Sequence, residues 1–213
     1  MIWRTDRWSC LVEALAFTGF MAWYIWNFQI EPAWVWRLFV AWLVVSFFVR
    51  GDSPKTLGWR ADNLWRATKR ASVFFALSTL LLLLGGLFLG MPQRAPAHFT
   101  DPHRFWGYLA FCLLQQVGLN SFLMNRLLAA FEKPAPAALV AGSLFAALHW
   151  PNPVLVPLTF LGGLAMAWLF ATERNILPLT IGQAILGVVV SWTFPIAWHH
   201  SMRVGPGFSS FPR

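Results

Sequence analysis

Residues 71–90 read ASVFFALSTLLLLLGGLFLG, a stretch that contains no charged side chain. About 20 consecutive apolar residues are enough to cross the hydrocarbon core of a bilayer as a helix. Apolar runs of similar length make up most of the chain. The sequence therefore predicts an all-α fold, a polytopic bundle of transmembrane helices.

The composition supports the same fold class and excludes several others. Of the 213 residues, 58% are hydrophobic and 11% are charged, and the mean hydropathy is +0.57. Because soluble domains are about 25% charged, a water-soluble enzyme, a disordered tail protein and a disulfide scaffold are all excluded. Cys10 and Cys112 both fall inside apolar runs and predict no disulfide. The net charge of +8 does not indicate nucleic-acid binding, because Lys and Arg lie between the runs, where they meet lipid head groups.

Pro and Gly residues separate the apolar runs into about seven predicted spans. These spans cover residues 9–29, 33–49, 70–91, 105–128, 136–150, 154–171 and 177–198. We predict three regions, namely a Trp-rich transmembrane hairpin at 1–54, a larger bundle at 55–199, and a tail at 200–213 that is flexible or held by a partner. No small-residue cleavage site follows a short apolar region near the N-terminus, so we expect no removable signal peptide.

The basic residues alternate between the two sides of the predicted bundle. One side collects eleven of the sixteen, namely Arg4, Arg7, Arg50, Lys55, Arg60, Arg66, Lys69, Arg70, Arg126, Lys133 and Arg174. The other side collects five, namely Arg37, Arg94, Arg104, Arg203 and Arg213. The positive-inside rule then predicts a cytoplasmic N-terminus and a C-terminus on the opposite side. We expect the location to be a bacterial inner or intracytoplasmic membrane.

Polar side chains inside the predicted spans are the candidate site residues, because such groups are costly at membrane depth unless they are satisfied. Gln115, Gln116 and Asn120 lie in the fourth span, His149 ends the fifth, and Gln183 lies in the seventh. A spacing of four residues puts Gln116 and Asn120 on one helix face. The pattern predicts one buried polar cluster within the bundle.

The order and spacing of these positions, across about residues 55–192, resemble the CAAX-protease and bacteriocin-processing (CPBP, or Abi) family of intramembrane proteases. In that family a Glu-Glu-x-x-x-Arg helix precedes Phe-x-x-x-His and then His-x-x-x-Asn or Asp. Phe145 to His149 fits the second motif. Further stretches that resemble the family are 55–60, the Gly-rich helix 160–169, and 175–183. The resemblance implies a CAAX-protease-like bundle at 55–199.

The family's catalytic groups are replaced at nearly every motif position. Gln115 and Gln116 stand where the family has Glu-Glu, Asn120 stands for its Arg, Gln183 for its second His, and Gly187 for its Asn or Asp. Only His149 keeps the expected side chain. The resemblance implies that glutamates and histidines activate a water, with or without a metal. A glutamine amide transfers no proton near neutral pH and is a poor metal ligand, so we expect no catalytic residue, no metal site and no cofactor.

Three hypotheses about function follow. The first is a pseudoenzyme, a non-proteolytic scaffold that acts as a structural or assembly subunit of a larger membrane complex, with other integral membrane proteins and lipids as partners. The alternative is an intramembrane endopeptidase of the CAAX-protease-like family that uses His149. The second alternative is a pigment- or haem-binding subunit, with His149 as the ligand of a tetrapyrrole beside the Trp-rich first spans.

Overall fold

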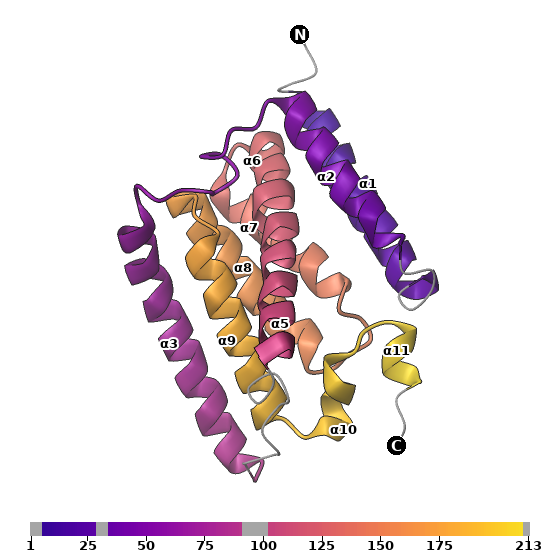
Figure 1. Cartoon of the computed structure of the whole chain (residues 1–213), viewed down its shortest axis with the longest axis vertical. Coiled ribbons are helices and arrows are strands. Elements are labelled where there is room, and N and C mark those ends of the chain that lie inside the picture. The colour runs from indigo at the N-terminus through magenta and orange to yellow at the C-terminus, as the bar shows by residue number, and fades with distance from the viewer. Residues whose placement is uncertain (1–5, 29–33, 91–101, 211–213) are drawn as a thin grey trace.

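The computed structural model describes residues 6–28, 34–90 and 102–210, and this part of the chain contains helices, turns and loops but no strand. Figure 1 shows the helices packed as an elongated bundle. In chain order they are α1 (Arg7–Asn27), α2 (Trp36–Arg50), α3 (Leu64–Phe88), α5 (Pro102–Gln116), the π-helix η2 (Val117–Met124), α6 (Asn125–Phe131), α7 (Pro134–Ala147), α8 (Leu155–Glu173), α9 (Leu177–Thr193), α10 (Ile196–His199), the 3₁₀-helix η3 (His200–Met202) and α11 (Pro206–Ser209).

Four helices are long and apolar enough to cross a membrane, namely Arg7–Asn27, Leu64–Phe88, His103–Phe131 and Leu155–Glu173. The third of these is the continuous run of α5, η2 and α6, and two shorter apolar helices are α7 and α9. The fold class, a polytopic transmembrane helical bundle, is therefore confirmed. The number of seven spans stays a prediction.

The helices are arranged around the continuous run α5–η2–α6, which lies at the centre of Figure 1. The α1–α2 hairpin lies on one side and contacts α6 and η2, while α3 lies on the other side against α9. Phe17 of α1 contacts Phe122 of η2, with ring centroids 4.6 Å apart. Because large rings bury much apolar area, this contact holds the hairpin against the rest of the bundle.

The α7 and α8 helices approach each other closely through two glycines. A Cβ added to Gly142 would lie 2.8 Å from the backbone nitrogen of Leu164 and 3.0 Å from the carbonyl oxygen of Phe160. Gly163 faces it from α8, where a Cβ would lie 3.2 Å from the Cα of Gly142. Small residues allow membrane helices to pack backbone against backbone, so this pair of glycines sets the distance between α7 and α8.

Side chains and turn residues define several helix ends. Asp6 caps α1 by accepting a hydrogen bond of 2.8 Å from the backbone N–H of Ser9. Gly51 ends α2 in the left-handed conformation, with φ 68°. The buried Asn152 accepts hydrogen bonds from the backbone N–H groups of Val154 and Leu155 at the start of α8. The capping interactions explain why the apolar runs are divided at these positions.

Two predicted span ends were wrong by several residues, and a third was wrong by a few. The third span begins at Leu64 rather than at residue 70, because the basic residues at its start are helical and pair with Glu173. The seventh span ends at Thr193 rather than at 198, shortly before Pro195, since a proline restricts the residue before it. The fifth ends at Ala147, so His149 lies in the turn after it.

The C-terminal tail is held by its own chain up to Ser210. The N–H of Gly205 donates to the carbonyl of Trp150 at 2.9 Å, and the ring of His200 stacks on Phe208 with centroids 4.1 Å apart. The side-chain amide of Asn152 donates to the carbonyl oxygens of His199 and Arg203. Intramolecular contacts account for the order of this segment, so the tail provides no argument for a partner. Residues 211–213 of the predicted tail lie outside the described residues.

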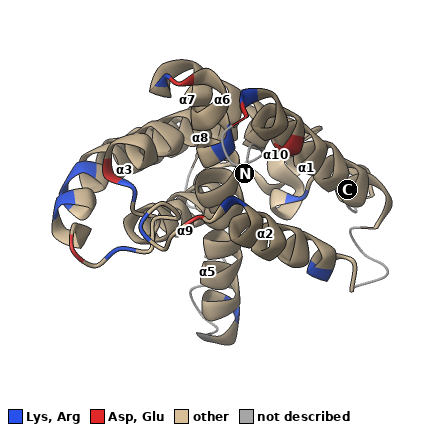
Figure 2. Cartoon of the chain, turned by 90° about the horizontal axis from the view of Figure 1, so that it is seen from above, with Lys and Arg blue, Asp and Glu red and all other residues tan. Residues whose placement is uncertain are grey.

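At the upper end of the bundle in Figure 1, α1 begins, α2 ends, α3 begins and α8 ends. These helix ends carry the basic residues Arg7, Arg50, Arg66, Lys69, Arg70 and Arg174. Figure 2 views the molecule from above and shows the blue segments at these helix ends and in the loops between them. We call this the basic end. The side of the membrane that the basic end faces stays a prediction.

Candidate functional site

Four of the predicted site residues form one chain of side-chain amides. Asn120 donates through Nδ2 to Gln116 Oε1 at 2.5 Å. Gln116 donates through Nε2 to Gln183 Oε1 at 2.5 Å, and Gln183 donates through Nε2 to Gln115 Oε1 at 2.5 Å. The amide chain, as we call these four residues, links the end of α5 and the π-helix η2 to α9. The predicted clustering of Gln116 and Gln183 is therefore confirmed.

The amide chain lies in the interior of the bundle. Gln116 and Asn120 are completely buried, and Gln116 Nε2 also lies 3.1 Å from the sulfur of Met166 on α8. The Oδ1 atom of Asn120 is buried and has no hydrogen-bond partner among the described residues. Asn120 lies within the eight residues of η2, and π-helical segments occur frequently at functional sites. The amide chain therefore lies at the positions that the resemblance aligned with the family's catalytic motifs.

His149 is not part of the amide chain. Its Nδ1 atom lies 2.7 Å from the carbonyl oxygen of Phe145, and its ring packs edge-on against the Phe145 ring with centroids 4.7 Å apart. A carbonyl only accepts, so Nδ1 carries the proton. Among the described residues, no hydrogen bond joins the imidazole of His149 to Gln115, Gln116 or Gln183.

Gly187, the last predicted motif position, has a packing role in α9. A Cβ added there would lie 1.8 Å from the hydroxyl oxygen of Tyr108 on α5. Because no side chain fits in that space, the glycine allows Tyr108 to lie directly on α9. The family's Asn or Asp at this position would need Tyr108 to move.

The amide chain offers no group for acid–base chemistry. Each of its members is neutral and can only donate and accept hydrogen bonds, whereas general acid–base catalysis needs a side chain that takes up and returns a proton. A zinc ion in a catalytic site needs three protein ligands from His, Cys, Asp or Glu. Within the described ranges, no three such side chains lie close enough to hold a metal ion, so the donors at this site do not fit the metal that the resemblance allowed.

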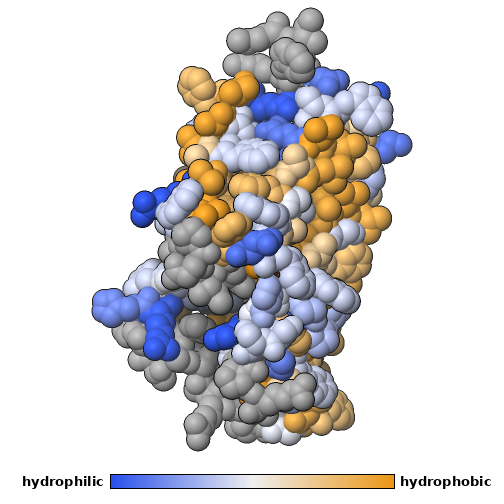
Figure 3. Space-filling view, turned by 90° about the vertical axis from the view of Figure 1, so that its right-hand side faces the viewer, coloured by the Kyte–Doolittle hydropathy of each residue, from blue (hydrophilic) through white to orange (hydrophobic). Residues whose placement is uncertain are grey.

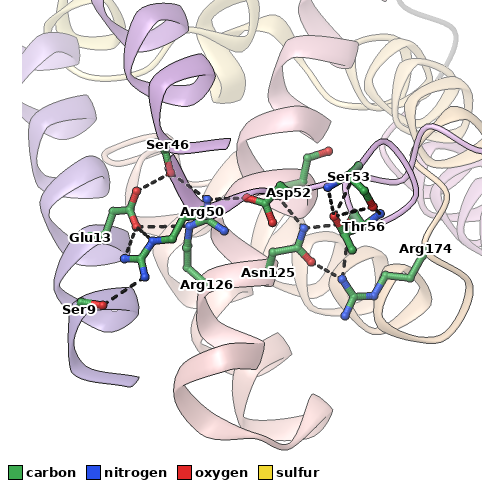
Figure 4. A network of polar contacts seen from close by, with 11 residues as sticks. Ser9, Glu13, Ser46, Arg50, Asp52, Ser53, Thr56, Asn125, Arg126 and Arg174 are labelled. Carbon is green, nitrogen blue, oxygen red and sulfur yellow. Dashed lines mark hydrogen bonds and ion pairs between the residues drawn. The ribbon is translucent and has the colours of Figure 1, made fainter. Parts of the chain in front are cut away.

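A second polar cluster, which the sequence analysis missed, connects α1 and α2 to α6. Figure 4 shows Glu13 between two arginines. Glu13 Oε2 accepts from Arg50 Nη2 at 2.7 Å and lies 3.3 Å from Arg126 Nε. Arg126 Nη2 also donates to Asp52 Oδ2 at 2.8 Å, and Ser46 Oγ donates to Glu13. The side chain of Arg126 is only 4% exposed, so these charges are satisfied mainly by one another.

This charged cluster borders an open pocket with a volume of about 340 Å³. The polar side chains that line the pocket are Arg50, Asp52, Thr56, Asn125, Arg126 and Arg174, and we call it the arginine pocket. It lies at the basic end, between the end of α2, the loop that follows it, α6 and the turn after α8. The sequence signal was Glu13, an acidic residue within a predicted span.

A third cluster joins α3 to the turn between α8 and α9. The buried carboxylate of Glu173 lies 2.8 Å from Arg66 Nε and 2.5 Å from Arg70 Nη1. Asn63 donates to the carbonyl of Glu173, and Asn175 donates to Asn63 Oδ1 at 2.9 Å. Both arginines are more than half exposed, so this cluster anchors the start of α3 and encloses no site.

We expect the substitution Gln183→Leu to lower the free energy of unfolding by about 1–3 kcal/mol. The change removes two hydrogen bonds of the amide chain, and interhelical bonds of this kind contribute about 0.6–2 kcal/mol each. The measurement is unfolding in mixed detergent micelles, followed by circular dichroism. Ile185→Leu on the exposed face of α9 is the control and should be neutral. Equal stability of the two variants would contradict a supporting role for the amide chain.

In a comparison with known protein families, residues 102–189 match the family model described as type II CAAX prenyl endopeptidase Rce1-like. The matched segment runs from α5 to α9 and includes the amide chain, His149 and Gly187. No curated protein and no solved structure matches the chain. The α1–α2 hairpin, α3 and the tail lie outside the matched segment.

Proposed function

Because residues 102–189 match the model of the CAAX-protease-like family, we propose that this membrane protein is a non-proteolytic relative of these enzymes that acts as a structural or assembly subunit of a larger membrane complex. The observation that carries the proposal is the amide chain at the family's motif positions. Each amide donates to the next, from Asn120 to Gln115. Such a chain stabilises a helix bundle but moves no proton.

The state of His149 supports the same proposal. Its protonated nitrogen is used in the bond to Phe145 within its own segment. This bond leaves Nε2 as the basic nitrogen, but the hydrolysis of a peptide also needs a group that returns a proton to the leaving amine. Neither a carboxylate nor a second imidazole stands at the other motif positions, so His149 alone replaces none of the lost groups.

The α1–α2 hairpin supports the role of a subunit. It lies outside the matched segment and carries large exposed apolar side chains, namely Val12, Trp23, Trp26, Val44, Val45 and Phe48. Figure 3 shows an apolar band on this side of the molecule, with hydrophilic residues above it at the basic end. Large aromatic side chains supply much contact area, and we infer that this face meets another integral membrane protein.

The distribution of charge supports an orientation. The basic end carries most of the Lys and Arg residues of the described ranges, and loops rich in these residues remain in the cytoplasm. We infer a cytoplasmic N-terminus, a C-terminus on the opposite side, and a bacterial inner or intracytoplasmic membrane as the location. Cysteine labelling from either side of the membrane, at a residue introduced into the loop 52–62, tests the orientation.

The protein is expected to cleave no farnesylated peptide that ends in a CAAX sequence. General acid–base groups contribute about 10²–10⁴-fold each to rate, and the groups at positions 115, 116 and 183 are absent. The assay uses the purified protein in lipid vesicles, with an active CAAX protease in parallel as the positive control. Cleavage that disappears in His149→Ala would overturn the proposal.

Mild extraction from the membrane tests the subunit role. We expect other integral membrane proteins to co-purify, and we expect Phe48→Ala on α2 to reduce their amount. Phe88→Ala on α3 is the matched control, because Phe88 is 91% and Phe48 is 84% exposed. A lone monomer in size-exclusion and mass analysis would count against the role.

A further inference from the structure

The arginine pocket contains more positive than negative charge. Three guanidinium groups line it, from Arg50, Arg126 and Arg174. The carboxylates next to them are Glu13, which pairs with Arg50 and Arg126, and Asp52, which pairs with Arg126. Neither carboxylate lies within ion-pair distance of Arg174.

Arg174 is the distinctive group of the pocket. Its Nη1 atom donates to the neutral oxygen Asn125 Oδ1 and lies 3.5 Å from the carbonyl of Thr56. Among the described residues, its Nε and Nη2 atoms have no hydrogen-bond partner. These N–H groups point from one planar fork, the arrangement that binds two oxygens of a phosphate at once.

The backbone and a neighbouring ring hold Arg174 in this position. The residue caps α8 in the left-handed conformation, with φ 50° and ψ 52°, and its guanidinium lies 5.5 Å from the centre of the Phe170 ring. Burial lowers the pKa of the guanidinium, and the charge of Asp52 opposes this shift. An anion in the pocket would compensate a positive charge that the described residues leave without an acidic partner.

The location of the pocket indicates the kind of anion. The pocket lies at the basic end, where the ends of α2 and α8 meet the loops. This depth corresponds to the head-group layer of a bilayer whose hydrocarbon core the helices span, and anionic head groups attract basic residues there. A volume of about 340 Å³ leaves room for a phosphate group together with water.

We propose that the arginine pocket binds a phosphate group, held by the Nε and Nη2 atoms of Arg174 with Arg50 and Arg126 behind it. Two sources have this chemistry, the head group of an anionic phospholipid and free phosphate. The inference goes beyond the proposed subunit role and does not depend on it, because neither the amide chain nor the outer face of the hairpin takes part.

The test measures binding to the purified full-length protein in neutral detergent micelles. Phosphatidylglycerol, phosphatidylcholine and inorganic phosphate are titrated separately, and the thermal midpoint of unfolding is the readout. We expect one of the two anions, phosphatidylglycerol or inorganic phosphate, to raise the midpoint in a saturable way. Phosphatidylcholine, whose head group is zwitterionic, should bind at least tenfold more weakly. The more effective anion identifies the source.

Three variants locate the binding. Arg174→Gln should weaken binding of the effective anion about tenfold, and Ala129→Phe should weaken it too by filling the pocket without changing the charge, because Ala129 also lines it. Arg7→Gln is the control, since Arg7 is an exposed arginine at the same end, paired at 3.9 Å with Glu132. If Arg174→Gln does not fold, the binding of the effective anion to Ala129→Phe decides whether the pocket is the binding site.

Two results would overturn the proposal. One is a wild-type protein that neither anion stabilises more than phosphatidylcholine does. The other is a change in binding that does not map to the pocket. This would be seen if a folded Arg174→Gln or Ala129→Phe variant bound the effective anion as well as the wild type, or if Arg7→Gln weakened binding as much as those two variants.

Discussion

Replacement of Glu13 by alanine is expected to lower the free energy of unfolding by about 3–5 kcal/mol, the cost of breaking a buried ion pair. The carboxylate of Glu13 is shared by Arg50 and Arg126, whose side chains are 11% and 4% exposed. Without it, two buried guanidinium groups lose a common counter-charge. Because Glu13 belongs to α1, Arg50 to α2 and Arg126 to α6, the substitution should loosen the attachment of the hairpin to the bundle.

Glu132→Ala is the matched control for this prediction. Glu132 pairs with Arg7 at 3.9 Å, and both side chains are more than 60% exposed. Exposed pairs of this kind contribute about 0–1 kcal/mol, so the variant should unfold close to the wild type. Reversible unfolding in mixed micelles provides the comparison. Equal stability of Glu13→Ala and Glu132→Ala would show that the charged cluster does not hold the hairpin.

Gly142→Ala is expected to lower the free energy of unfolding by about 3 kcal/mol, near the upper end of the range for inserting a methyl group into a packed core. The added Cβ would approach the backbone of Leu164 and Phe160 to within 2.8 and 3.0 Å. Backbone atoms cannot rotate away as a side chain can. The α7 and α8 helices must therefore separate along their whole contact.

Gly85→Ala distinguishes this clash from the general effect of replacing a helical glycine. Gly85 lies in α3, and a Cβ added there has no atom within 4 Å. Alanine favours the helix over glycine by about 1 kcal/mol, so this variant should be neutral or slightly more stable. The same unfolding measurement applies to both variants. A Gly142→Ala protein as stable as Gly85→Ala would contradict the close packing of α7 on α8.

The amide chain could be predicted from the sequence because apolar segments make an isolated polar residue conspicuous. Gln116, Asn120 and Gln183 stand out against their neighbours, and the resemblance assigned them to one centre before any geometry was known. His149 was expected in the same cluster, yet its hydrogen bond is to Phe145, four residues earlier in the chain. The backbone carbonyl of Phe145 and the amide chain were both possible partners for the imidazole. The spacing of residues in the sequence does not show which of the two partners it bonds.

The charged cluster could not be derived in the same way. Arg126 was counted among the basic residues of the loops, whereas its side chain is buried between Glu13 and Asp52. Its partners lie 113 and 74 positions away in the chain, and only the packing of α1 and α2 beside α6 brings them together. An acidic residue within a predicted span, such as Glu13, needs a partner at membrane depth, but the sequence contains no signal for which arginine provides it.

The one-way order of the amide chain has a consequence for how such a centre changes over evolutionary time. Within the chain, Gln116 and Gln183 each donate one hydrogen bond and accept another. A carboxylate accepts hydrogen bonds but donates none. The single replacement Gln116→Glu would leave Oε1 of Gln183 without its donor and would place a charge in an apolar interior. Gln115 only accepts within the chain, so Gln115→Glu would remove none of its donors. An acidic side chain at position 116 therefore costs stability unless Gln183 changes with it, and the two amides restrict each other's replacement.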